Sequence, residues 1–185
     1  MQDARVQKTI AAIRRTFFAM LLDTPYKKIT VTALCQRASI NKKTFYRYYE
    51  TLEFLFAEVV GEYADGFIER IKNYRVPDEL DKINREFFTY SVAQGKVYEK
   101  IICCPAYDSI SEKMVAEFIS RTWSDSPAFQ NLDESKKNIL TCFIHNVGLE
   151  LYRQWIKSGK NIPLEEIISL SNDLLCRGVF GFIKD

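Results

Sequence analysis

Apolar residues recur every three or four positions along most of this chain, which is the spacing expected for the buried face of an α-helix. The first such segment covers about residues 5–22. Its apolar face consists of Val6, Ile10, Ile13, Phe17, Met20 and Leu21. The same spacing continues, with short breaks, into the last segment of the chain. The sequence therefore predicts an all-α protein.

Residues 30–49 predict two short helices joined by a tight turn. Thr30 is placed to cap the first of them and Asn41 the second, because these side chains accept hydrogen bonds from the free N–H groups of a first helical turn. Thr51 is predicted to cap a fourth helix, which covers about residues 52–74. Together these signals predict a compact helical unit at the N-terminal end.

The predicted fourth helix is long enough to leave that unit, so we place the domain boundary inside it. Residues 1–52 then form one domain, and residues 53–185 form a second, larger one. The chain has 185 residues, of which 47% are apolar and only 7 are Gly and 5 Pro. This length and composition are sufficient for a buried core and argue against disorder.

Short breaks separate the predicted helices of the second domain. Pro77 opens a helix that Gly95 ends, and a short helix follows as far as Cys104. Ser109, with Glu112 three residues later, matches a capping box and predicts the start of a further helix.

Two long helices are predicted at the end of the chain, over about residues 134–158 and 163–182. Both carry apolar residues on more than one face, and a helix of this kind contacts more than one neighbour. A central position in the core and a position at a subunit interface both fit this pattern, and the pattern by itself does not choose between them.

The helix predicted after Asn41 carries more basic and aromatic side chains than a folded core can use. Phe45 and Tyr49 lie four residues apart, on one face, and are its candidates for the core. The remaining surface presents donors suited to phosphate oxygens and base edges. These donors are Lys42, Lys43, Thr44, Tyr46, Arg47 and Tyr48. The pattern is typical of a helix that lies in the major groove of DNA, and a solvated basic helix without a ligand is the alternative.

Charge is divided unevenly between the two predicted domains. Residues 1–50 contain 10 Lys or Arg and 3 Asp or Glu, whereas residues 51–185 contain 16 and 21. The formal net charge of +2 hides this division. A basic N-terminal third fits a polyanionic partner that binds one end of the molecule only, which charges serving solubility alone would not predict.

Several other features narrow the function. The five cysteines have no CxxC spacing, and no signal-like or membrane-length apolar segment occurs, so we expect a cytoplasmic protein. The single histidine, His145, has no Asp, Glu or Cys at ligand spacing, so no metal site is predicted. No Gly-rich phosphate loop, GxSxG or HExxH motif is present. We therefore expect neither an enzyme nor a cofactor.

Residues 9–56 resemble the N-terminal DNA-binding region of the TetR family of bacterial regulators. The matching segments cover residues 21–26, 29–31 and 37–49. The run Thr-Phe-Tyr-Arg-Tyr-Tyr at residues 44–49, which follows an N-cap residue and a basic pair, is the most specific part. The resemblance covers about the first third of the chain, and beyond it only the helical layout is shared.

Three positions depart from the family's pattern. Ser39 stands where the family usually has a turn Gly, so a strained or differently shaped turn is expected. Pro25 replaces a common Gly before the aromatic residue. Leu52 replaces a Lys that touches phosphate in family members, so that contact is not expected here.

The resemblance implies an N-terminal three-helix HTH DNA-binding domain and a C-terminal helical domain for ligand binding and dimerisation. It further implies a homodimer that binds a pseudo-palindromic operator in double-stranded DNA, most often to repress, and that a small apolar or aromatic effector releases. The expected DNA-binding residues are Thr30, Thr32, Arg37, Asn41, Lys42, Lys43, Thr44, Tyr46, Arg47 and Tyr48.

Two further sets of residues follow from the same resemblance. The expected dimer interface consists of Leu140, Ile144, Val147, Leu151, Trp155, Ile167, Leu174, Leu175 and Val179. The expected effector pocket consists of Phe88, Tyr98, Cys103, Phe118, Trp123, Cys142, His145 and Tyr152. The alternative is a ligand-independent DNA-binding regulator or coactivator controlled by a protein partner, and a tightly packed second domain without a cavity would favour it.

Overall fold

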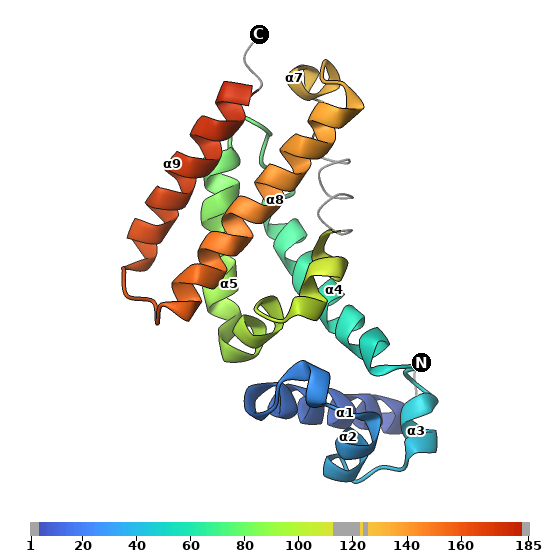
Figure 1. Cartoon of the computed structure of the whole chain (residues 1–185). Coiled ribbons are helices and arrows are strands. Elements are labelled where there is room, and N and C mark those ends of the chain that lie inside the picture. Colours follow the sequence, from blue (N-terminus) through green and yellow to red (C-terminus); the bar gives the residue numbers. More distant parts are fainter. Residues whose placement is uncertain (1–3, 113–122, 124–125, 183–185) are drawn as a thin grey trace.

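The computed structural model describes residues 4–112, 123 and 126–182 and is built of helices within these ranges, which confirms the predicted all-α class. Figure 1 shows a small helical domain at one end, joined through one helix to a larger bundle. Residues 105–112 are helical. The other elements are α1 (Ala4–Asp23), the short 3-10 helix η1 (Tyr26–Lys28), α2 (Val31–Arg37), α3 (Lys42–Tyr46), α4 (Leu52–Ile71), α5 (Leu80–Ile102), α7 (Pro127–Gln130), α8 (Glu134–Lys157) and α9 (Leu164–Phe182).

Four helices begin at a side chain that accepts a hydrogen bond from the backbone N–H three residues later. The capping residues are Thr30, Asn41, Thr51 and Asp133, with oxygen-to-nitrogen distances of 3.1, 2.7, 3.2 and 2.9 Å. Each cap of this kind stabilises a helix by about 1 kcal/mol. The first three were predicted, so the starts of α2, α3 and α4 follow from local sequence.

The core of the first domain combines apolar side chains from α1, α2, α3 and the N-terminal half of α4. Its fully buried members include Ile13, Phe17, Leu34, Phe45, Leu55 and Phe56. Ile101 of α5 is buried in the same cluster. The C-terminal end of α5 therefore packs on the first domain, and α4 runs from that domain into the larger bundle (Figure 1).

The second domain is built around α5, α8 and α9, which lie side by side (Figure 1). One of its buried clusters includes Phe88, Tyr152 and Trp155, and the other includes Leu140 and Leu175. Among the residues that the structure describes, no helix combines the length and the apolar character needed to cross a lipid bilayer.

The break predicted at Gly95 is confirmed. Gly95 has φ 77° and ψ −167°, so α5 consists of two helical parts joined at this residue. The helix start predicted at Ser109 is wrong, because residues 105–112 are already helical and begin at Pro105. Proline suits a first helical position, where its fixed φ is helical and its missing N–H is not needed. The Ser109 hydroxyl instead donates to the Ala106 carbonyl oxygen, at 3.5 Å.

The turn between α2 and α3 places Ser39 in the left-handed region of backbone conformation, with φ 55°. This is the position at which the sequence predicted a strained or unusual turn. A residue with a Cβ atom pays about 1–2 kcal/mol for this conformation, whereas glycine adopts it freely.

We predict that Ser39→Gly stabilises the protein. Relief of the strain is partly offset by the greater flexibility of glycine in the unfolded chain, about 0.4–1 kcal/mol. The free energy of unfolding should therefore rise by roughly 0.5–1 kcal/mol, measured by urea denaturation. Ser39→Ala, which keeps the Cβ atom, is the matched control and should give no gain; equal stabilisation by Ala would contradict the explanation.

Candidate functional site

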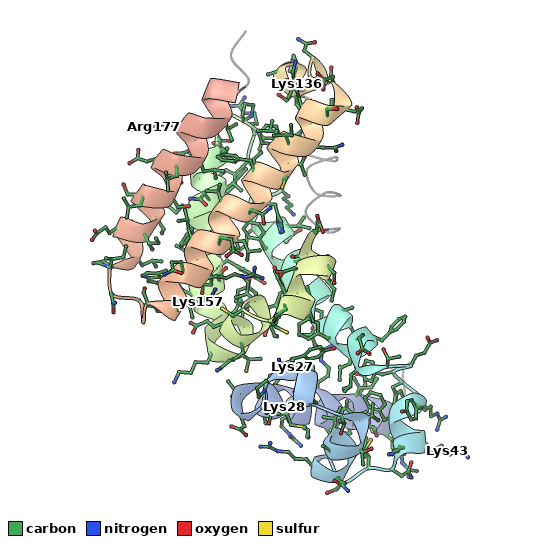
Figure 2. All side chains as sticks on the ribbon, viewed as in Figure 1. Lys27, Lys28, Lys43, Lys136, Lys157 and Arg177 are labelled. Atoms are coloured by element: carbon green, nitrogen blue, oxygen red, sulfur yellow. The ribbon has the colours of Figure 1, made fainter. Side chains whose placement is uncertain are left out.

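Helix α3 presents a polar and aromatic surface over a buried anchor. Phe45 is completely buried and Tyr49 nearly so, as their four-residue spacing predicted. Lys42, Lys43, Tyr46 and Arg47 are exposed, and the Tyr46 side chain is 54% accessible to solvent. Figure 2 shows Lys43 projecting outward from α3, away from the body of the first domain.

A chain of contacts fixes α3 against α4 and α1. The Phe45 and Tyr49 rings lie 5.7 Å apart, centroid to centroid, and the Tyr49 hydroxyl donates to Glu58 Oε1 on α4 at 2.9 Å. Burial, together with this hydrogen bond, raises the pKa of Tyr49. Glu58 also lies 3.2 Å from Arg14 of α1, which pairs in addition with Glu62. The orientation of α3 is thus tied to that of α4.

The other predicted DNA-binding residues differ in whether their side chains already form contacts within the first domain. The Thr30 oxygen accepts the capping bond, which leaves its hydroxyl hydrogen available, and Thr32 is exposed. Arg37 is paired with Asp23 at 3.1 Å, an ion pair inside the domain that the sequence pattern did not indicate.

Thr44 and Tyr48, which were also predicted to bind DNA, are half-buried. The Thr44 hydroxyl donates to Asn41 Oδ1 at 2.9 Å, and Tyr48 packs against the core of the first domain. The exposed donors of α3 and its C-terminal cap are therefore the narrower set of Lys42, Lys43, Tyr46 and Arg47.

The second domain contains a cavity of about 150 Å³. Helices α4, α5, α8 and α9 line it, together with residues 105–112. The described lining residues are Tyr63, Ala64, Phe67, Ile68, Val76, Leu80, Ile83, Asn84, Phe87, Tyr98, Tyr107, Ser111, Trp123, Ile144, His145, Gly148, Leu149 and Leu175. Its mainly apolar and aromatic lining with a few polar groups is the composition usual for a small-molecule site.

Three of the predicted pocket residues, Tyr98, Trp123 and His145, line this cavity. Phe118 lies outside the described residues. The remaining four do not line it. Phe88 and Tyr152 are fully buried and pack edge to face, 5.6 Å apart, in a separate cluster. Cys103 packs against that same cluster, and Cys142 is exposed.

The sequence pattern missed several lining residues because it gives the period of a helix but not its rotation. On α5, Phe87 lines the cavity whereas Phe88, one residue or about 100° further round, does not. On α4, Tyr63 and Phe67 belong to the inward-facing stripe that the sequence does show. The four-residue spacing of Tyr63 and Phe67 could therefore have identified this wall of the cavity from the sequence.

The cavity wall contains no Asp, Glu, Lys or Arg among its described residues. Burial lowers the pKa of His145, which favours its neutral form. Burial also raises the pKa of Tyr98, and raises that of Tyr107 to about 12, so both hydroxyls stay protonated at neutral pH. The lining residues that the structure describes are therefore electrically neutral.

Two tyrosines of the cavity wall also contact the first domain. Tyr63 of α4 and Tyr107 pack against the core of the first domain as well as against the cluster around Phe88. Arg153 of α8 is nearly buried; its Nε donates to the Ile102 carbonyl oxygen at 2.7 Å. The Arg153 guanidinium also lies 5.8 Å from the centre of the Tyr107 ring.

Most residues predicted at the dimer interface are buried or half-buried within the chain itself. Five of them are buried within it: Leu140, Trp155, Ile167, Leu175 and Val179. Three more are half-buried: Ile144, Val147 and Leu151. Packing among α5, α8 and α9 buries much of these apolar stripes within one chain, and a dimer interface at these residues stays a prediction. Leu174 alone is exposed, at 57%.

A different apolar patch lies on the outer surface of α8 and α9. It consists of Ile139, Phe143, Leu170 and Leu174, which are all exposed. The Phe143 ring occupies the space above Gly178, where an added Cβ atom would come within 2.7 Å of it. The patch therefore continues across both helices, and we refer to these four residues as the α8/α9 patch.

We predict that the protein loses stability as the pH falls through about 6.5, the ordinary pKa of histidine. The unfolded chain takes up a proton on its single histidine more readily than the folded protein does, because burial lowers the folded-state pKa of His145. The stability that neutral His145 contributes is fully present above about pH 6.5 and is lost as the pH falls toward its lowered folded-state pKa. Urea denaturation at pH 7.5 and 5.5 measures it, and an equal loss in His145→Gln would refute the assignment.

No protein-family model and no curated protein matches the chain. Solved structures do match. NalD of Pseudomonas aeruginosa, the secondary repressor of the MexAB-OprM multidrug efflux pump, aligns with a TM-score of 0.70 at 14% identity, over 94% of this chain and 96% of that chain.

Two regulators named FadR align in the same way, and the first is described as a regulator of fatty acid degradation. FadR from Bacillus halodurans has a TM-score of 0.64 at 15% identity, over 97% of this chain and 98% of that chain. The transcriptional regulator FadR from Bacillus subtilis, solved with stearoyl-CoA, has 0.60 at 16%, over 89% and 95%. The chain therefore has the TetR-like fold, with an N-terminal helix-turn-helix domain followed by a helical second domain.

Proposed function

We propose that this chain is a cytoplasmic, ligand-responsive transcriptional regulator that binds operator DNA as a homodimer. The observation that carries the proposal is the exposed surface of α3. Lys42, Lys43, Tyr46 and Arg47 project from a helix held in place by buried Phe45. Basic and hydroxyl donors in this arrangement fit phosphates and base edges, and a core has no use for them.

The comparisons support a regulator rather than an enzyme. The matching structures are described as a repressor and as transcriptional regulators, and one of them was solved with an acyl-CoA ligand. Because their sequence identity to this chain is low, these structures establish only its fold. Support for DNA binding comes from the residues of α3.

Dimerisation would use the α8/α9 patch. An exposed group of large apolar side chains favours contact with another apolar surface, since burial is worth about 25 cal/mol per Å². Two copies related by a two-fold axis would present the same patch to each other and carry two α3 helices. Such a dimer would read two half-sites of a pseudo-palindromic operator.

The effector would act from the cavity through α4. Tyr63 and Tyr107 contact both the cavity and the core of the first domain. A ligand that displaces these rings would shift α4, to which α3 is tied through Tyr49 and Glu58. The separation of the two α3 helices in the dimer would then no longer fit successive major grooves. The presence of a cavity favours this control over control by a protein partner.

We predict that Lys43→Ala and Tyr46→Ala each weaken binding to a selected operator by about tenfold, because each removes a donor to DNA. Lys43→Ala should also flatten the dependence of log affinity on log salt by about one unit per lost phosphate contact. The operator comes from selection on random duplexes, and titrations at several salt concentrations give the slopes. Lys157→Ala, an exposed lysine on α8 (Figure 2), is the control; intact binding by both α3 variants would refute the proposed interface.

We predict that neighbouring leucines of α9 respond differently to aspartate. Leu174→Asp should give folded monomers, because its charge would lie in the apolar contact between two copies. Leu175 is 3% exposed, so Leu175→Asp should unfold or strongly destabilise each chain, by more than about 3 kcal/mol. Light scattering gives the mass and urea denaturation the stability. A dimer that persists in Leu174→Asp would place the interface elsewhere.

A further inference from the structure

We propose that the effector is a small, uncharged, single-ring aromatic compound with one hydroxyl group, a simple phenol, and that His145 binds this hydroxyl. The inference rests on the proposed function, in which the cavity is the effector site. It names the chemical class that this particular cavity accepts.

The volume of the cavity gives room for about one ring. An apolar cavity of about 150 Å³ is known to accommodate benzene, and the cavity here has the same volume, about 150 Å³. A long acyl chain has several times as many carbon atoms as benzene. The ligand of the matching Bacillus subtilis regulator, stearoyl-CoA, therefore exceeds what this cavity holds.

The described part of the wall offers no counter-charge to an ionised ligand. No described lining residue has an ionised side chain at neutral pH, so a carboxylate, phosphate or ammonium group would be buried without a counter-charge. Burial of an unpaired charge is among the costliest events in a protein interior. A phenol, like tyrosine, has a pKa of about 10 and enters uncharged.

The shape of the wall favours an aromatic ring. Six aromatic residues surround the space: Tyr63, Phe67, Phe87, Tyr98, Tyr107 and Trp123. Several of these rings already meet edge to face; Tyr63 and Tyr98 lie 4.9 Å apart, and Phe67 and Phe87 lie 5.9 Å apart. A ligand ring would extend this arrangement, which is the preferred packing of aromatic groups.

His145 is the polar residue of the described wall that we assign to the ligand's hydroxyl. The Asn84 amide donates to Ser171 and Asn172, at 3.0 and 2.7 Å, and its oxygen accepts from Ser171 at 3.2 Å. The His145 imidazole makes no hydrogen bond to any residue in the described part of the chain. Its neutral form offers both a donor and an acceptor nitrogen, which suits a hydroxyl group.

The charged residues around His145 lie outside the cavity wall. Those that affect its titration are Glu112, Asp108, Arg153 and Glu150. Arg153, which is paired with Asp108 and Glu150, lowers the pKa of His145 and the three carboxylates raise it, but burial, which lowers it, is the largest effect. The imidazole therefore faces the ligand as a neutral partner.

The test is calorimetric titration of the full-length protein with four probes: 4-methylphenol, toluene, 4-methylbenzoate and stearoyl-CoA. We expect 4-methylphenol to bind once per chain. Toluene, which lacks the hydroxyl, should bind about three- to tenfold more weakly, as the loss of one hydrogen bond predicts. The two anionic probes should bind at least tenfold more weakly than 4-methylphenol. Tighter binding of either anion, or no binding of 4-methylphenol, would overturn the inference.

Two substitutions of His145 separate its proposed role from a structural one. His145→Leu should reduce the affinity for 4-methylphenol to that for toluene and leave toluene binding unchanged, which also shows that the cavity remains folded. His145→Gln, which can still form a hydrogen bond, should retain most of the preference for 4-methylphenol. An equal loss for both probes in His145→Leu would mean that His145 only supports the cavity.

Ala64→Phe fills the cavity from α4 and provides a second test of its location. It should abolish binding of both 4-methylphenol and toluene, and undiminished binding would place the ligand elsewhere. These titrations contain no DNA, so they decide the ligand class separately from the proposed function. Binding to a selected operator, with its release by each probe, tests the regulator: specific operator binding with release by an anionic probe alone would overturn the ligand class and leave the proposed function standing.

Discussion

Helix α4 contributes side chains to the core of the first domain over its N-terminal half and to the wall of the cavity over its C-terminal half. Leu55, Phe56 and Val59 are buried in the first core, whereas Phe67 and Ile68 line the cavity. Tyr63, between these groups, contacts both. Because a helix is held rigid by its backbone hydrogen bonds, neither end can turn freely without the other. The arrangement of the two domains depends on this shared helix.

The same dependence explains how a short helix such as α3 can hold a defined orientation. With only five residues, α3 has few backbone hydrogen bonds of its own. Its position comes from the Asn41 cap at one end and from buried Phe45 and the Tyr49–Glu58 hydrogen bond at the other. The exposed lysines and Tyr46 need no part in holding it. The side chains that position α3 are thus different from those that we propose to bind DNA.

Charged groups of the second domain are paired outside the described wall of the cavity. Arg153 is nearly buried, but its guanidinium is satisfied by the Ile102 carbonyl oxygen and by Asp108 and Glu150. A buried charge without such partners would be strongly destabilising. The pairing holds α8 against the end of α5, next to Tyr107, and leaves hydrogen bonding and aromatic packing as the means of recognising a ligand. These are the interactions on which a neutral aromatic ligand relies.

The sequence by itself determined the features that depend on near neighbours along the chain. These were the helical class, the caps Thr30, Asn41 and Thr51, the break at Gly95, and the exposed and buried faces of α3. Each is decided within a few residues, by a side chain that caps a turn or by a four-residue spacing. The unusual turn at Ser39 was likewise predictable from the local sequence.

Only the tertiary structure decided which apolar stripe of a helix faces which neighbour. Phe87 and Phe88 are equally apolar, yet only Phe87 lines the cavity. Leu174 and Leu175 are likewise equally apolar, yet Leu174 is exposed and Leu175 is buried. A step of one residue rotates the side chain by about 100°, and a helix with two apolar faces gives no local signal for choosing between them. The choice is made when α5, α8 and α9 pack together, and that packing leaves both the cavity and the α8/α9 patch.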